Sequence, residues 1–229
     1  YETIESDRLF NNLLSSQPMA FNLFCPLMKL LKESPEEATM VIKSALPMFP
    51  IHLVTKVDLE FIPSNYKDLT GDKSAMDAII CFKTADGKDG FIAIETKYSE
   101  NLGTNEASNT DKAIEIIRQL SCFNSDFEER INKKQTKLTQ IYRNFLLSER
   151  YGLWISAESY SIVLSPELHP STDDEVLSVT NEMRPEYKGK LQSITLESFT
   201  NKLISESSEE YAEIFRRFRD RYLSFDRVE

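Results

Sequence analysis

The chain has 229 residues, 41% of them hydrophobic, which is typical of a globular protein with a sizeable core. Its formal net charge of −10 argues against non-specific nucleic-acid binding, which needs clustered Lys and Arg side chains. Three widely spaced cysteines argue against a disulfide framework or a cysteine zinc site, and two histidines argue against a histidine-rich metal centre. We therefore expect a single domain over residues 1–229, located in the cytoplasm, with no signal peptide and no membrane span.

The first half of the chain predicts helices followed by strands. Residues 17–31 are apolar and aromatic and predict a buried helical segment with a break at Pro26. Ser34 and Pro35 are typical of a helix start, and that helix should end near Leu46. Apolar patterning then predicts three strands, over residues 51–62, 76–83 and 91–98.

Turn residues and periodicity complete the expected order of elements. Asp86-Gly87 and Asp89-Gly90 mark a turn that joins the second and third strands in a hairpin. Helices are predicted over residues 112–123, 127–150, 173–183, 197–206 and 208–224, and strands over residues 159–165 and 191–196. This order predicts an α/β fold in which helices flank a mixed β-sheet.

Charged residues stand at the ends of two strands that this pattern pairs. Asp77 begins the second strand, and Glu95 and Lys97 end the third. Because strand side chains alternate, Glu95 and Lys97 share one face with Phe91 and Ala93. Ionised groups at the edge of a sheet core need partners, so this placement favours a functional site.

The E-x-K spacing is weak support by itself. It occurs about once by chance in a chain of this size. Glu186-Tyr187-Lys188 and Asp86-Gly87-Lys88 have similar spacing, but neither lies on a strand paired with an upstream Asp. The informative feature is therefore the structural context of the three residues.

Asp77 followed by Glu95-Thr96-Lys97 resembles the motif of the PD-(D/E)XK nuclease superfamily. The expected αβββαβ order is similar to its restriction-endonuclease-like core, although Met76 stands where the motif often has Pro. The chain also resembles, over nearly its whole length, a bacterial family of restriction-endonuclease-like proteins. The resemblance implies one nuclease domain with C-terminal helical additions to that core. The stretches that carry it are Leu14–Phe24, Gly71–Asp77, Ile94–Tyr98, Gln140–Asn144 and Arg221–Phe225.

The motif residues also support a metal-dependent mechanism on physical grounds. Mg²⁺ prefers oxygen ligands and keeps several waters, so the carboxylates of Asp77 and Glu95 and the carbonyl of Thr96 are sufficient protein ligands. The ion, which Mn²⁺ could replace, would activate a water for phosphodiester hydrolysis. Lys97 would orient that water or stabilise the transition state. The alternative is a structural ion pair of Lys97 with one of the two acids.

Residues near and on the long predicted helix extend the candidate site. Gln140 and Arg143 share a helical face, and Gln140 is a candidate catalytic residue that holds phosphate or water. Hydrogen bonds that cap the sheet are the alternative. Basic side chains in this region are candidates for binding the nucleic-acid backbone, with a solvated helix face as the alternative. They are Lys133, Lys134, Lys137 and Arg143.

Polar residues outside the motif are weaker candidates. Gln17 and Asn22 interrupt an apolar helix, where amides are often only satisfied core groups. Glu60 could supply another acid, but an exposed strand face accounts for it equally well.

We therefore expect a Mg²⁺-dependent endonuclease that hydrolyses phosphodiester bonds of DNA. Two alternatives stay open at this point: a non-catalytic restriction-endonuclease-like module for binding or assembly, and a hydrolase of a smaller phosphate ester. A homodimer is compatible with the sequence, which does not decide the oligomeric state or the choice between DNA and RNA.

Overall fold

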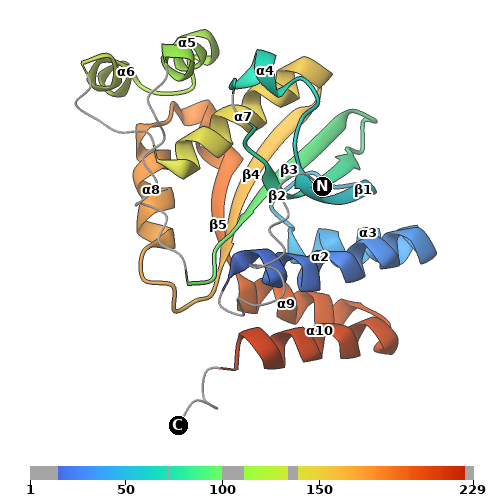
Figure 1. Ribbon diagram of the computed structural model, residues 1–229. Coiled ribbons are helices and arrows are strands. Elements are labelled where there is room, and N and C mark those ends of the chain that lie inside the picture. The colour runs from blue at the N-terminus through green and yellow to red at the C-terminus, as the bar shows by residue number, and fades with distance from the viewer. Residues whose placement is uncertain (1–14, 72, 100–110, 134–138, 225–229) are drawn as a thin grey trace.

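The computed structural model describes residues 15–71, 73–99, 111–133 and 139–224, and it has helices on both faces of a mixed sheet (Figure 1). Five strands lie in the order β1-β2-β3-β4-β5. β2 runs antiparallel to both β1 and β3, whereas β4 runs parallel to β3 and β5 runs parallel to β4. The strands are β1 (Leu53–Phe61), β2 (Met76–Lys83), β3 (Asp89–Thr96), β4 (Glu158–Ser165) and β5 (Leu191–Thr195).

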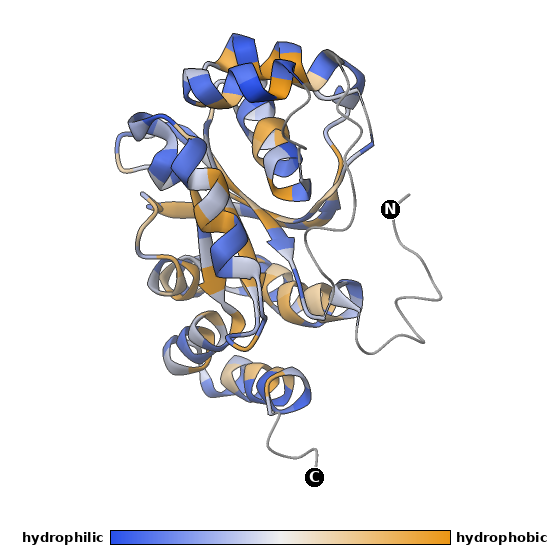
Figure 2. Cartoon of the chain, turned by 90° about the vertical axis from the view of Figure 1, so that its left-hand side faces the viewer, coloured by the Kyte–Doolittle hydropathy of each residue, from blue (hydrophilic) through white to orange (hydrophobic). Residues whose placement is uncertain are grey.

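Four helices cover one face of the sheet and lie below it in Figure 1. Their apolar sides share a buried cluster with Ala78 and Ile80 of β2 and with Ile92 and Ile94 of β3. Figure 2 shows the mainly hydrophobic strands between helices that carry both hydrophobic and hydrophilic residues. The four helices are α2 (Ser16–Glu33), α3 (Pro35–Ala45), α9 (Leu196–Glu206) and α10 (Glu209–Tyr222).

The helix α7 (Gln140–Ile155) covers the other face of the sheet. Leu147 of α7 packs in a buried cluster with Phe91 and Ala93 of β3, which confirms the predicted alternation along this strand. None of the described helices is both long and apolar enough to span a membrane. The remaining helices are α4 (Tyr66–Leu69), α5 (Asp111–Leu120), α6 (Ser125–Asn132), α8 (Thr172–Glu182) and the 3₁₀ helix η1 (Pro185–Lys190).

The break expected at Pro26 is wrong, because α2 continues through this residue. Proline removes one backbone hydrogen bond from a helix interior. Leu23 and Leu27, on either side of Pro26, are fully buried against the sheet and its other helices. The packing of this apolar face keeps the helix continuous despite the missing N–H group.

The continuous helix expected over residues 127–150 is also wrong, because this region forms two helices. α6 ends at Asn132, and α7 begins at Gln140 and extends to Ile155. Phe127 of α6 stacks on Tyr142 of α7, with ring centroids 5.0 Å apart, inside one buried cluster. In a continuous helix these two positions would lie about 22 Å apart, so the contact requires two separate helices.

The hairpin between β2 and β3 turns at only one of the two expected Asp-Gly pairs. Gly87 has a φ of 83°, a conformation that favours glycine in turns. Gly90 instead lies inside β3, opposite Phe82, and a Cβ atom there would come within 2.6 Å of the Phe82 ring. Gly90 is therefore required for close packing within the sheet, and assigning Asp89-Gly90 to the turn is wrong.

Candidate active site

The three motif residues come together where the start of β2 lies beside the end of β3. Ala78 pairs with Ile94 in the antiparallel register, so Asp77 and Glu95 lie one step further along adjacent strands. Alternation along β3 places Glu95 and Lys97 on the side of the sheet that α7 covers. The short hairpin thus brings residues that are eighteen positions apart in the chain to one end of the sheet.

Asp77 is held against the end of β3 by Thr96. Its Oδ2 atom accepts hydrogen bonds from the backbone N–H of Thr96 at 2.7 Å and from the Thr96 hydroxyl at 2.8 Å. Burial and the negative charge of Glu95 raise the pKa of Asp77 to about 8, although the Thr96 hydrogen bonds and the charge of Lys97 act to lower it. Two carboxylates therefore share a region in which one lysine does not compensate both charges.

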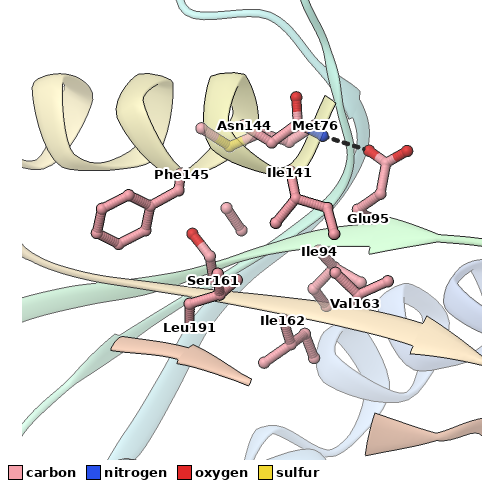
Figure 3. Close-up of a pocket in the computed structure, with 11 residues that line it drawn as sticks. Met76, Ile94, Glu95, Ile141, Asn144, Phe145, Ser161, Ile162, Val163 and Leu191 are labelled. Carbon is pink, nitrogen blue, oxygen red and sulfur yellow. Dashed lines mark hydrogen bonds between the residues drawn. The ribbon is translucent and has the colours of Figure 1, made fainter. Parts of the chain in front are cut away.

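Glu95 and Lys97 form a buried ion pair that α7 completes. The two residues are only 6% and 7% exposed, and Lys97 Nζ lies 2.7 Å from Glu95 Oε1. Gln140 bridges the pair, because its amide nitrogen donates to Glu95 Oε1 at 2.7 Å and its amide oxygen accepts from Lys97 Nζ at 2.9 Å. Asn144 donates to Glu95 Oε2 at 2.6 Å from the next turn of the same helix (Figure 3). The structure thus brings Gln140 to the motif, and it adds Asn144, to which sequence reasoning gave no role.

The donor set fits a hard divalent cation. Among the residues that the structure describes, no three or more His, Cys, Asp or Glu side chains gather where they could hold a metal ion. Asp77 and Glu95 are two carboxylates, which is the number that Mg²⁺ or Mn²⁺ needs when water and substrate phosphate complete its shell. Burial, and after it the charge of Glu95, disfavours the ionised form of Asp77, and a cation would stabilise that form. The backbone carbonyl of Thr96, which the sequence predicts as a further ligand of the cation, belongs to the residue directly after Glu95.

Of the basic residues expected to bind nucleic acid, the structure describes Lys133 and Arg143. Arg143 on α7 donates to the Ser74 hydroxyl at 2.6 Å, just before β2, and so lies near the motif. Lys133 follows α6 and forms an ion pair with Glu129, one turn earlier on the exposed surface. Lys134 and Lys137 lie outside the described residues. Of the two described members of this group, Arg143 lies beside the candidate site and Lys133 does not.

Gln17 and Glu60 meet at the neighbouring strand end. Gln17, near the start of α2 and only 8% exposed, donates to Glu60 Oε1 at 2.8 Å. Glu60 lies on β1 between the residues that pair with Ala78 and Met76, so it is beside Asp77 in the sheet. It also has a φ of 47°, which is unusual for a residue with a side chain. Gln17 is therefore more than an isolated core amide, because it links α2 to the strand next to the motif.

A small cavity lies behind Glu95, between α7 and the strands β3 and β4 (Figure 3). Its volume is about 20 Å³, which is roughly the space of one water molecule. Most of its lining is apolar, and the Ser161 hydroxyl in its wall has no hydrogen-bond partner among the described residues. The cavity is too small for a nucleotide, so it belongs to the protein interior and not to a substrate pocket.

The sheet order, the helices on both faces and the acids at adjoining strand ends define an α/β domain of the restriction-endonuclease-like class. A family model of the PD-(D/E)XK nuclease superfamily matches residues 1–224, and the chain belongs to this superfamily. No curated protein and no solved structure matches the chain. Proteins of the superfamily are generally nucleases that use divalent metal ions, so membership supports nuclease activity on nucleic acid.

Proposed function

We propose that this chain is a metal-dependent endonuclease that hydrolyses phosphodiester bonds of DNA, with Mg²⁺ as the cofactor and Mn²⁺ as a substitute. The observation that carries the proposal is the meeting of Asp77, Glu95, Lys97 and Gln140 at one end of the sheet. A structural ion pair would account for Glu95 and Lys97 alone. It would not account for Asp77, a second buried acid whose pKa is raised by burial and by the charge of Glu95.

Asp77 and Glu95, with the Thr96 carbonyl, would hold the cation. A bound cation of this kind polarises the scissile phosphate and lowers the pKa of a water molecule. Thr96 positions Asp77 through two hydrogen bonds, both to Oδ2 of its carboxylate. These two bonds do not involve the other carboxylate oxygen, Oδ1. The two acids are therefore oriented by the backbone and side chains around them before any ligand binds.

Lys97 and Gln140 would act on the water and on the developing charge. Lys97 is buried beside Glu95, where a positive charge stabilises an anionic transition state more strongly than it would in water. Gln140 accepts from Lys97 and donates to Glu95, so it fixes the two charged groups relative to each other. This arrangement supports a role for Lys97 in orienting water or stabilising charge, with Gln140 beside it.

The proposal is tested by incubating the purified chain with supercoiled plasmid and Mg²⁺ or Mn²⁺. We expect nicking or linearisation that is abolished by EDTA and by Lys97→Ala. Lys190→Met is a matched control, because Lys190 forms a comparable ion pair with the buried Glu149 away from the motif. Cleavage by wild type and by Lys190→Met, but not by Lys97→Ala, supports the proposal. Equal activity of Lys97→Ala and wild type would contradict it.

The same assay separates the two other functions that the sequence leaves open. The net charge of −10 and the pairing of Lys133 with Glu129 weaken the case for tight duplex binding. A hydrolase of smaller esters would cleave bis-p-nitrophenyl phosphate but leave plasmid and single-stranded RNA intact. A binding or assembly module would cleave none of these substrates with either metal. Cleavage of RNA in preference to plasmid would correct the choice of DNA.

We also propose that residues 1–229 act as one nuclease domain in the cytoplasm. All five strands belong to one sheet, which supports a single domain. Cys25, Cys81 and Cys122 are free thiols, as is usual in a reducing compartment. A homodimer stays a prediction, which light scattering of the purified chain would test.

A further inference from the structure

The helix α7 presents three polar residues at four-residue spacing towards the sheet. Such spacing places Gln140, Asn144 and Ser148 on one helical face. The first two donate to Glu95, Gln140 to Oε1 at 2.7 Å and Asn144 to Oε2 at 2.6 Å. The third donates to the backbone carbonyl of Tyr160 at 3.4 Å. One carboxylate is therefore held, one oxygen each, by two amides that lie one helical turn apart.

These two amides stand on a firmly packed support. Ile141 and Phe145, which follow the two amides in the chain, are 2% and 0% exposed. Both belong to the buried cluster that also contains Val163 of β4, the strand paired with β3. A shift of the amides relative to Glu95 would therefore disturb the packing of α7 on the sheet. The direction of the Glu95 carboxylate is set by the fold.

The two amides hold Glu95 without adding a charge, and Lys97 Nζ, 2.7 Å from Oε1, supplies the positive charge beside it. Amides satisfy the oxygens of a buried carboxylate but carry no net charge, whereas a Lys or Arg at position 144 would cancel the negative charge. Rotation of the carboxylate would break at least one of the two hydrogen bonds. Glu95 is therefore rigid, and with Asp77 beside it the site holds two acids and one lysine, a combination that suits a small divalent cation.

We propose that Gln140 and Asn144 form an amide clamp on Glu95, and that Asn144 is a positioning residue which makes the site select Mg²⁺ or Mn²⁺ over Ca²⁺. This inference rests on the proposed metal-dependent function. Mg²⁺ demands a near-ideal octahedral arrangement of oxygens, whereas Ca²⁺ accepts six to eight ligands in flexible geometry and often takes both oxygens of one carboxylate. A clamped carboxylate suits the first kind of ion, and a mobile one suits the second.

The clamp is tested with Asn144→Leu, which has a similar size and no donor, and with Asn144→Ser, whose hydroxyl is too short to reach Glu95. Ser148→Ala is the matched control, because it removes a buried hydrogen bond of the same helical face that does not reach the motif. The Kd values of Mn²⁺ and Ca²⁺ are measured by calorimetry on the full chain, and melting temperatures show that each variant is folded.

We expect wild type and Ser148→Ala to bind Mn²⁺ more tightly than Ca²⁺. In the Asn144 variants, Mn²⁺ affinity should fall about 10- to 100-fold, as is common when a residue supporting a metal ligand is removed. Ca²⁺ affinity should fall less, so the preference for Mn²⁺ shrinks. A merely structural role of Asn144 would not change this ratio.

Two results would overturn the inference, and they differ in what else they affect. If wild type binds Mn²⁺ and a folded Asn144 variant keeps the same affinity and the same Mn²⁺ preference, the clamp is wrong and the proposed nuclease function stands. If wild type binds neither cation, the metal-dependent function itself fails, and the clamp fails with it. The Asn144→Ser variant keeps the test decisive if the larger leucine prevents folding.

Discussion

Two buried Glu–Lys ion pairs contact α7, one near its start and one in its second half, and one of the two has the features of a site. Glu95 and Glu149 are 6% and 5% exposed, and each is held by a lysine. The Glu149–Lys190 pair joins α7 to η1, and the Ser159 hydroxyl donates to Glu149 at 2.6 Å. That pair connects elements that are distant in the chain, as expected of a structural contact.

The Glu95–Lys97 pair differs in its surroundings. Its two members lie two residues apart at the end of β3, so the pair connects no separate elements. It has a second acid beside it, Asp77, whose pKa is raised to about 8 by burial and by the charge of Glu95. Lys190 has a side chain 30% exposed, whereas that of Lys97 is only 9% exposed. A buried ion pair is therefore a poor indicator of function, and an uncompensated neighbouring acid is a better one.

The largest expected effect comes from the same substitution at the two glutamates. Glu95→Gln should lower the rate of plasmid cleavage by about 10²- to 10³-fold, because it removes a charge from the reacting region. Glu149→Gln should leave cleavage by the folded protein unchanged. It should lower the free energy of unfolding by about 2 kcal/mol, the usual size of a hydrogen bond to a charged group. Cleavage assays and urea unfolding of both variants measure these effects. If Glu149→Gln also loses cleavage while folded, the contrast between a functional Glu95 and a structural Glu149 is wrong.

The second prediction concerns the pH dependence of stability without metal. The folded pKa of Asp77, about 8, is above its ordinary value of 3.8, so the folded state keeps a proton that the unfolded chain releases. The metal-free protein should therefore lose stability as the pH rises through this window, by about 1.4 kcal/mol per pH unit at most. Asp77→Asn should remove that loss, because asparagine does not ionise and its oxygen can still accept from Thr96.

Metal should reverse the loss, because a cation stabilises the ionised pair of acids and binds only the folded state. We expect Mg²⁺ or Mn²⁺ to raise the melting temperature of wild type, with a larger rise at higher pH, and to leave Asp77→Asn unaffected. Glu149→Gln should keep both the pH slope and the metal response. The proposal is contradicted if Asp77→Asn strongly lowers stability without metal and if metal does not change the melting temperature of wild type. Asp77 would then be only a structural partner of Lys97.

A smaller effect is expected from the arginines at the two ends of α7. Arg143 lies near the motif and donates to Ser74, whereas Arg150 donates to Gln119 at the other end of the helix. If Arg143 contacts a phosphate, Arg143→Ala should reduce the slope of log affinity against log salt by about 0.9. Arg150→Ala should not change it. Binding is measured in a Lys97→Ala background, so that the DNA stays intact.

Lys133 and Lys134 provide a further comparison in the same binding assay. Replacing both by Ala should also reduce the salt slope if these residues contact the nucleic-acid backbone. Lys133 already forms an ion pair with Glu129, so its share should be smaller than that of Arg143. If the salt slope does not change, we would conclude that both lysines belong to a solvated surface and do not contact the nucleic-acid backbone.

The smallest effect is expected at two serines of β4. Ser159→Ala removes the hydrogen bond to Glu149 and should lower the free energy of unfolding by about 1–2 kcal/mol. The Ser161 hydroxyl is buried without a partner among the described residues, so Ser161→Ala should be within about 0.5 kcal/mol of wild type. Thermal or urea unfolding measures both. A strongly destabilised Ser161→Ala would indicate a water in the cavity that bonds this hydroxyl.

Local pattern in the sequence determined most of the framework. The helix predicted to start at Ser34-Pro35 and end near Leu46 is α3, with Pro35 as its first residue and Leu46 as its C-cap. Alternation along β3 predicted that Glu95 and Lys97 share a face with Phe91 and Ala93, and the short hairpin predicted that Asp77 meets Glu95. These features depend on backbone geometry over a few residues, so composition and spacing are sufficient to predict them.

Tertiary structure decided the partners of the buried polar groups. Asn144 reaches Glu95 across 49 positions of the chain, and Lys190 reaches Glu149 across 41. Local periodicity does not predict which partners these two glutamates find, because those partners lie on elements far away in the chain. A buried charge requires a partner. Which partner it finds depends on the position of α7 on the sheet, and this position is determined by apolar packing between residues from distant parts of the chain.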